Sequence, residues 1–439
     1  MVTGLILICL AAITLMVLWK PPIAVGFALS QFAVEQFAQF ASPLFSRHFA
    51  LINYFSGAMV ALALLVTVVR YQSVWRPYPK AALWILGLIF WAILSYVWCQ
   101  YEPAYRVLTV GAMPYWLTFI VMMPLIIRRP EDLRLALISA MAIAIVPLLI
   151  TFFSATWVGR GYVVQEDTTG QWVAKQGKSL PLVLSLSAAY VALIFTLLRF
   201  KGLGQVLVVL RWLAVVFSVV FILRTGSRGQ LLAMTAVLMI FIPLSRQWKR
   251  AQDVISTTIM VALFALIVGG VLIYVVEEGS KRWEIQHIVE SLKEGRVDRS
   301  VDVLSSYVEA GPMWWLIGLG NSASYHPEIH GFMPEVLPVE VLAEEGLIGF
   351  FLFIGGIIAV YTSFRRSLHL VRDHPDLRAT IVAVTALFTL ELILSLKQGS
   401  LVRGYMMFGI AIIILRWEML VHGLISRQYG MLDQTRTTL

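Results

Sequence analysis

The sequence has few charged residues: only 13% of its 439 residues are Asp, Glu, Lys or Arg, roughly half the fraction found in soluble proteins. Apolar residues make up 59%. Apolar stretches of about 20 residues, the length of a helix that crosses ~30 Å of hydrocarbon, recur along nearly the whole chain. A barrel is not expected, because its strands would alternate between apolar and polar residues. The composition therefore predicts an all-α, polytopic membrane protein.

Cysteine is also scarce. The two cysteines, Cys9 and Cys99, lie in or at the ends of apolar stretches, so they predict neither a disulfide framework nor a metal site. No pair of nearby aspartates and no His/Cys cluster stands between the apolar stretches, and we therefore expect no metal and no other cofactor. The formal net charge is +9, but the basic residues are scattered among short connections, which argues against a nucleic-acid partner.

The first apolar run, residues 3–19, has no basic residue before it and no small-residue cleavage site after it. We expect it to be retained as a membrane span and not removed as a signal peptide. No internal repeat is visible in the chain.

Twelve apolar stretches are predicted to be transmembrane helices. Basic residues cluster in every second connection, as Arg128 and Arg129 do, and such clusters mark the cytoplasmic ends of membrane helices. The predicted spans are residues 3–19, 49–70, 81–99, 107–127, 132–156, 180–199, 204–224, 228–246, 253–276, 346–364, 379–396 and 401–420. The chain divides into a helical bundle (1–276), one long external loop that caps it (277–345), and further membrane helices with a cytoplasmic tail (346–439).

Residues 22–45 are the least regular part of this pattern. The segment is long enough to cross a membrane but carries Glu35 and several glutamines, and we interpret it as interfacial or re-entrant. If it does cross, the amino terminus moves to the other side of the membrane, an alternative that Lys20 favours.

The stretch "RTGSRGQLLA", residues 224–233, places two arginines on the side opposite the basic clusters, the side that also holds Lys397 and Arg403. Arg228 is surrounded by glycine and serine, which let a ligand approach the backbone. The apolar run that follows predicts a helix whose first amides and positive dipole end favour an anion. The planar guanidinium of arginine can hold two phosphate oxygens at once. We therefore predict a diphosphate at Arg228, with Arg224 either sharing the task or extending to the membrane surface.

The long loop, residues 277–345, contains the remaining candidates. Glu340 and Glu344 lie four residues apart on one face of a predicted helix, where the helix dipole explains acidic residues in a first turn. If the two glutamates lie at the mouth of a cavity, a catalytic role for them remains open. Earlier in the loop the pattern predicts an amphipathic helix, with a shared apolar face made of Val301, Val303, Leu304 and Val308.

Two parts of the chain together resemble the O-antigen ligase and polymerase superfamily, membrane enzymes that act on undecaprenyl-diphosphate-linked glycans. The stretch "TGSRGQLLA" (225–233) is similar to the family's serine-arginine-glycine helix start. The stretches "GLGNS" (318–322) and "PEVLPVEVLAEEGLIGF" (334–350) are similar to its glycine-x-glycine turn and the helix after its long loop. Since the order of these motifs also agrees, the resemblance covers most of the chain. It implies a bundle like that of GT-C glycosyltransferases, in the bacterial inner membrane, with an active site facing the periplasm.

The resemblance also implies which residues form the site, and it contains one departure. Counting back from Gly346 places Glu335 where most relatives have a histidine that helps the acceptor hydroxyl to attack. Either Glu335 acts as the base, which a carboxylate is able to do, or His330 reaches the same place, or this chain works without such a group.

The family's second arginine matches Arg299, with Arg296 as the second choice. Arg228 and Arg299, with Arg224, are therefore the expected diphosphate ligands. Arg296, Glu340 and Arg403 are the further residues expected to contact substrate.

The activity that the resemblance implies is transfer of a glycan from undecaprenyl diphosphate to an acceptor hydroxyl, with inversion at the anomeric carbon and without a metal. A polymerase of a surface or exported polysaccharide would use a second lipid-linked glycan as acceptor, and a ligase would use lipid A-core. The missing histidine favours the polymerase, whose partners would include the bilayer and a chain-length regulator protein. A transporter or flippase of lipid-linked anions would also place arginines in a cavity, although such proteins commonly show internal repeats.

Overall fold

The computed structural model describes residues 2–71, 78–99, 101–158, 162–166, 172–173, 181–200, 204–246, 298–327, 329 and 335–437, together with positions 255, 258, 269 and 270. Within them the chain is helical except for three short strands, which pair antiparallel in the order β1-β2-β3. The strands are β1 (Thr156–Val158), β2 (Tyr162–Glu166) and β3 (Trp172–Val173). The helices are α1 (Val2–Trp19), α2 (Pro22–Ala41), α3 (Pro43–Arg47), α4 (Leu51–Tyr71), η1 (Lys80–Ala82), α5 (Leu83–Leu94), η2 (Ser95–Val97), α6 (Glu102–Tyr105), η3 (Arg106–Val110), α7 (Gly111–Tyr115), η4 (Trp116–Met122), α8 (Met123–Ile126), α9 (Pro130–Ser154), α10 (Pro181–Leu197), α11 (Gly204–Arg224), α12 (Arg228–Ser245), α15 (Asp298–Glu309), α16 (Pro312–Ile317), η7 (Ala323–Tyr325), α17 (Leu337–Leu370), α18 (Pro375–Gln398) and α19 (Tyr405–Thr437).

Among the described residues, eight helices are long and apolar enough to cross a membrane, and the shorter helices α10 and α12 are apolar as well. The protein is therefore a polytopic, helical membrane protein, as its composition predicted. Each predicted span coincides with a helix or with consecutive helical segments, except residues 253–276, most of which lie outside the described residues. The count of twelve spans stays a prediction.

Basic residues from distant parts of the chain meet at one end of the bundle, which we call the basic end. Arg70 donates hydrogen bonds to the backbone at the end of α1, with 2.8 Å to the carbonyl oxygen of Trp19. Arg134 donates to the carbonyl oxygen of Arg199 at 2.5 Å and forms an ion pair with Asp376 at 3.5 Å. This convergence is what a pattern of basic clusters in alternate connections requires of one membrane face.

The interpretation of residues 22–45 as interfacial or re-entrant is wrong. α2 is one continuous helix of 20 residues, and nearly all of its side chains are buried. It packs mainly against α9 and α4, so closely that a Cβ on Gly26 would lie 2.5 Å from the carbonyl oxygen of Ala136. Its polar side chains misled the prediction because neighbouring helices, and not water, surround them.

The first two helices run between the two ends of the bundle in opposite directions. The end of α1 lies beside Arg70 at the basic end, whereas its start lies beside the end of α2, where Thr3 and Ser42 share a hydrogen bond of 2.8 Å. Lys20 therefore lies in the turn at the basic end. This arrangement fits the alternative in which residues 22–45 cross the membrane.

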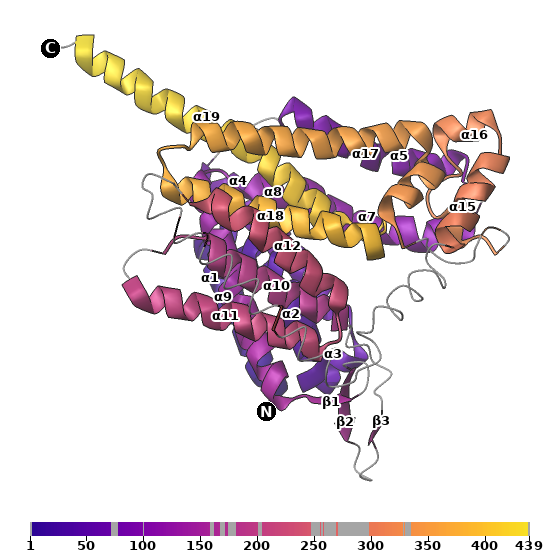
Figure 1. Cartoon of the computed structure of the whole chain (residues 1–439), viewed down its shortest axis with the longest axis horizontal. Coiled ribbons are helices and arrows are strands. Elements are labelled where there is room, and N and C mark those ends of the chain that lie inside the picture. Colours follow the sequence, from indigo (N-terminus) through magenta and orange to yellow (C-terminus); the bar gives the residue numbers. More distant parts are fainter. Residues whose placement is uncertain are drawn as a thin grey trace.

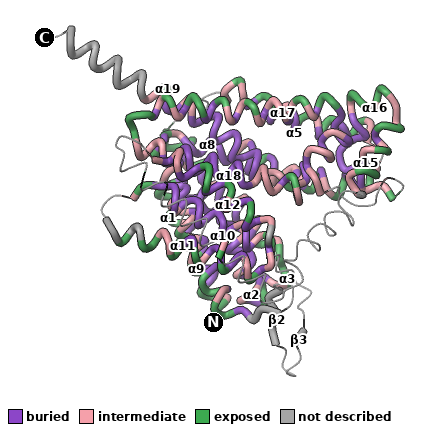
Figure 2. The backbone as a smooth tube through the Cα atoms, viewed as in Figure 1, coloured by how far each residue is buried: buried purple, intermediate pink, exposed green. Residues whose placement is uncertain are grey.

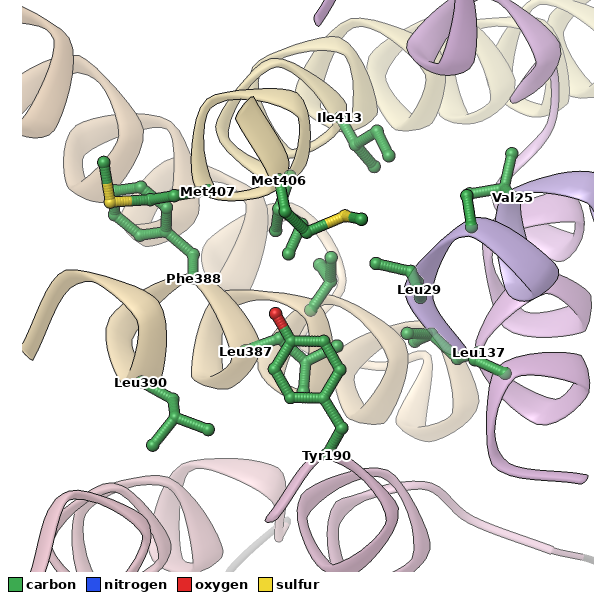
Figure 3. Close-up of a cluster of buried hydrophobic side chains, with 14 of the residues drawn as sticks. Val25, Leu29, Leu137, Tyr190, Leu387, Phe388, Leu390, Met406, Met407 and Ile413 are labelled. Atoms are coloured by element: carbon green, nitrogen blue, oxygen red, sulfur yellow. The ribbon is translucent and has the colours of Figure 1, made fainter. Parts of the chain in front are cut away.

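The helices form two groups that diverge from one another (Figure 1). One group, with α5, α7 and α17, extends to α15 and α16, and the other, with α9, α10 and α2, extends to α3 and the strands. α18 contacts helices of both groups, and the buried residues concentrate where the groups meet (Figure 2). Figure 3 shows side chains from five helices packed there: Leu29, Leu137, Tyr190, Phe388 and Met406.

α15 is amphipathic, as expected, but the predicted face is wrong. Val303 and Tyr307 are buried against the rest of the loop, while Val301 and Val308 are 55% and 57% exposed. Two residues of helix turn the chain by about 200°, so Val301 and Val303 point in nearly opposite directions.

Candidate functional site

The glycine-x-glycine turn and the start of α17 pack directly against each other at the end of the bundle opposite the basic end, which we call the site end. α17 bends at Gly346, whose φ of 68° lies in the left-handed region. The backbone amides of Leu319 and Gly320 donate to carbonyl groups of the turn that precedes the bend, at 2.9 and 2.8 Å. A Cβ on Gly346 would lie 2.4 Å from the backbone nitrogen of Gly318. Glycine is therefore required here both by conformation and by space.

Asn321, which follows this turn, ties three further elements together and is completely buried. Its side-chain nitrogen donates to Glu345 Oε1 at 2.8 Å, and its side-chain oxygen accepts a hydrogen bond from the Thr109 hydroxyl. Its backbone N–H donates to the Ser95 hydroxyl at 2.9 Å. The turn, η3, η2 and α17 thereby form one connected platform at the site end.

Glu340 and Glu344 share a face of α17, as predicted, but they bind different loops. Glu340 is 3% exposed and accepts hydrogen bonds from the Ser400 hydroxyl (2.8 Å) and the Leu401 backbone N–H (3.0 Å). Glu344 is also buried and accepts from the backbone N–H of Ser322 at 2.7 Å. The helix dipole alone does not account for these residues, because each carboxylate anchors a separate loop to the start of α17.

α12 begins at Arg228, the residue predicted to begin it. The preceding turn contains Gly226 with a φ of 68°. It is held by the hydroxyl of Thr225, which lies 2.5 Å from the Ser185 hydroxyl and 3.0 Å from that of Ser227. The backbone of Arg228 thus occupies the first turn of the helix, and its side chain lies outside what the structure describes.

Lys397, near the end of α18, lies against this first turn. A Cβ on Gly229 would be 2.7 Å from Lys397 Nζ, so the missing side chain lets the ammonium group approach the backbone of α12. The positive end of the helix dipole and the ammonium group therefore act in the same small volume. The sequence identified Lys397 only as one of several external basic residues and gave it no role, because its contact with α12 depends on how the helices pack.

Two other arginines that the sequence predicted to contact the ligand also lie at the site end, and each packs against a different residue. Arg224 is exposed, with its guanidinium 4.8 Å from the ring centre of Phe152 and a hydrogen bond of 3.3 Å to that residue's carbonyl oxygen. Arg403 is exposed near Tyr325. Burial raises the pKa of the Tyr325 hydroxyl to about 12; Glu340 adds to the rise, and Arg403 opposes it. The charges of Arg403 and Glu340 therefore act on the same tyrosine.

Arg299 and Glu335 bind each other. Arg299 Nη1 lies 3.0 Å from Glu335 Oε1, and the two side chains are 35% and 18% exposed. Glu335 has a φ of 63°, an uncommon conformation outside glycine, and lies two residues before the start of α17. One expected diphosphate ligand and the expected base are thus partners in this structure.

The other sequence-based candidates, Arg296 and His330, lie outside the described residues. In the described part of the chain, no group of three or more His, Cys, Asp or Glu side chains is arranged to hold a metal ion. Compared with protein-family models and with curated proteins, the chain matches none.

Proposed function

We propose that the protein transfers a glycan from undecaprenyl diphosphate to an acceptor hydroxyl at the site end of the bundle. The observation that carries the proposal is the contact of Lys397 Nζ with the first turn of α12 at Gly229. The first backbone amides of a helix, its positive dipole end and an ammonium group together favour a phosphate-like anion. Arg228 begins the same turn, and a diphosphate on a lipid chain reaches such a site from within the membrane.

The chemistry requires an attacking hydroxyl, a base and stabilisation of the leaving group. The acceptor oxygen forms a bond to the anomeric carbon while the bond from that carbon to the diphosphate breaks, which inverts the centre. The hydroxyl proton passes to the carboxylate of Glu335. The departing undecaprenyl diphosphate keeps the electron pair, and its charge is stabilised by Lys397, Arg228 and Arg299.

The ion pair between Arg299 and Glu335 suggests the order in which the two substrates bind. As long as Arg299 binds the carboxylate, neither group is fully available for its proposed task. A diphosphate that draws Arg299 away leaves Glu335 able to accept a proton. We therefore propose that the donor binds first and thereby frees the Glu335 carboxylate to act as the base.

We assign the protein as a polymerase of a surface or exported polysaccharide in the bacterial inner membrane, with the site end facing the periplasm. The acceptor would then be a second lipid-linked glycan, and a chain-length regulator would be a natural partner. The departure at Glu335 from the family histidine supports this choice over a ligase that uses lipid A-core.

The test is transfer by the purified protein in lipid nanodiscs, supplied with an undecaprenyl-diphosphate oligosaccharide, with and without lipid A-core and in the presence of chelator. A ladder of longer lipid-linked chains without lipid A-core supports the polymerase. Product on lipid A-core alone would make the protein a ligase. Absence of product with both acceptors would contradict transfer and favour a transporter of lipid-linked anions.

Arg228→Ala should abolish transfer in this assay, whereas Arg366→Ala should not. Arg366 is an exposed residue of α17, far along the helix from Glu340. Its Nη1 lies 3.7 Å from Glu418 Oε1. Full activity of Arg228→Ala would remove the diphosphate site from the proposal.

A further inference from the structure

α2 carries a group of polar side chains inside the bundle that the proposed chemistry does not use. Glu35 Oε1 accepts hydrogen bonds from Gln39 Nε2 at 3.0 Å and from Asn53 Nδ2 of α4 at 3.5 Å. The hydroxyl of Tyr405, the first residue of α19, interacts electrostatically with the Glu35 carboxyl group. Polar groups placed within a membrane bundle are costly and mark substrate or ion pathways.

Gln31, one turn before Glu35, is completely buried. The Tyr405 hydroxyl is its side-chain hydrogen-bond partner. The other donors and acceptors of its amide have no hydrogen-bond partner in the described part of the chain. Asn53 forms a side-chain hydrogen bond with Tyr115. A buried amide that leaves most of its donors and acceptors unused destabilises a fold, so Gln31 is better explained by a ligand than by packing.

Aromatic rings line the same place. The ring of Tyr405 stacks on Tyr115 and on Phe119, with 5.1 Å between ring centres in both cases. Tyr115, Tyr405 and Asn53 are only partly buried, so the group is not completely enclosed by the bundle. The helical segment that carries Tyr115 changes to π-helix on both sides of α7, at η3 and η4, and π-helical segments are frequent at functional sites.

We infer that Gln31, Glu35, Asn53, Tyr115 and Tyr405 form a saccharide subsite, which we call the α2 subsite. Amide and carboxyl groups offer the adjacent donors and acceptors that neighbouring sugar hydroxyls require, and aromatic faces cover the C–H surface of a sugar ring. Among the described residues, the contacts given for this group include no Lys or Arg, so it suits a neutral sugar and not the diphosphate.

The connection between α18 and α19 links the α2 subsite to the same end of the bundle as the proposed transfer site. Tyr405 follows directly after the segment that contains Lys397, Arg403 and Leu401, whose backbone N–H binds Glu340. A sugar held at Tyr405 would therefore lie at the site end of the bundle. This inference rests on the proposed function and assigns the α2 subsite to the acceptor glycan.

The test uses a water-soluble oligosaccharide repeat unit that carries neither lipid nor phosphate. Its binding to the protein in nanodiscs is measured by saturation-transfer NMR. We expect the unaltered protein and the control Arg366→Gln to bind it, and Gln31→Leu to bind it at least ~10-fold more weakly, the loss of roughly one hydrogen-bonded contact or more. Equal binding by Gln31→Leu, or no binding by the unaltered protein, would overturn the inference.

A second measurement does not depend on the folding of a variant. Glu35 in the unaltered protein is labelled with dicyclohexylcarbodiimide, which reacts with carboxyl groups in membranes. Protection by the oligosaccharide supports the α2 subsite. Protection by sodium ions and not by the oligosaccharide would replace it with a cation site.

The two proposals can fail separately. If the protein transfers glycan and Gln31→Leu leaves the KM for the acceptor unchanged, the α2 subsite is refuted and the proposed glycan transfer is not. Saccharide binding without transfer would leave the α2 subsite and refute the transferase.

Discussion

Arg299 at the start of α15 and Glu335 just before α17 form an ion pair with 3.0 Å between Nη1 and Oε1. Both side chains remain partly exposed, at 35% and 18%. Partly exposed ion pairs are worth about 1 kcal/mol or less. In the proposed transfer, a diphosphate with two negative charges can therefore compete with the carboxylate for Arg299.

Glu335→Gln should separate the two roles of this pair. We expect kcat for transfer to fall by about 10²- to 10⁴-fold, the usual contribution of a general base. The KM for the lipid-linked donor should fall, because Arg299 no longer binds a carboxylate and is available to the diphosphate. Steady-state kinetics in nanodiscs measure both values. An unchanged kcat would move the base to His330 or to a mechanism without a side-chain base.

Lys397→Gln should weaken binding of the donor. An ammonium group that donates to a phosphate contributes roughly 1.5–3 kcal/mol, or about 10- to 100-fold in affinity. The control is Arg366→Gln, which removes one positive charge from a side chain that is 68% exposed and lies elsewhere on the surface of α17. Donor affinity that falls equally in both variants would indicate a general effect of charge and contradict a specific contact at Gly229.

The helices follow from the sequence because each depends on a local pattern. Apolar runs of about 20 residues predict membrane helices, and glycine and serine before an apolar run predict where α12 begins, which is at Arg228. α2 was misjudged because Glu35 and its glutamines also fit an interfacial helix. Only the positions of α4, α9 and α19 show that those side chains face other helices.

The candidate site is harder to predict, because its residues meet through packing between distant segments. The sequence placed Glu340 and Glu344 on one helical face, but gave no sign that Ser400 and Ser322 are their partners. Nothing local in the sequence distinguishes Lys397 from other basic residues at helix ends. The contact with α12 exists because Gly229 lacks a side chain where α18 ends.

Gly346→Ala should destabilise the protein strongly. The new Cβ would lie 2.4 Å from both the Gly318 nitrogen and the Leu316 carbonyl oxygen, at a φ of 68° that alanine rarely adopts. Backbone strain of this kind costs about 1–3 kcal/mol before any clash is counted. Thermal unfolding in detergent measures the loss. Gly111→Ala is the matched control, since its Cβ would meet no atom within 4 Å, and a fall in stability as large for this variant would contradict the explanation.

The reactivity of Cys99 should depend on pH in a way that reports the platform around Asn321. Burial raises the pKa of the Cys99 thiol from its ordinary 9.0 to about 11, and the thiol donates to the Asn321 carbonyl oxygen at 3.3 Å. Only the thiolate reacts. At pH 8 an ordinary thiol would be about one-tenth ionised and Cys99 about one-thousandth, so labelling should be roughly 100-fold slower.

This prediction is measured in a Cys9→Ser background with a water-soluble methanethiosulfonate between pH 7 and pH 10. The labelling rate of Cys99 should rise about tenfold for each pH unit, because the whole range lies below its pKa. Asn321→Ala removes a residue that fastens the turn beside Cys99 and should speed labelling at pH 8. A rate that levels off near pH 9 would mean that the thiol is as accessible to water as an ordinary cysteine, which is incompatible with a closed platform at the site end.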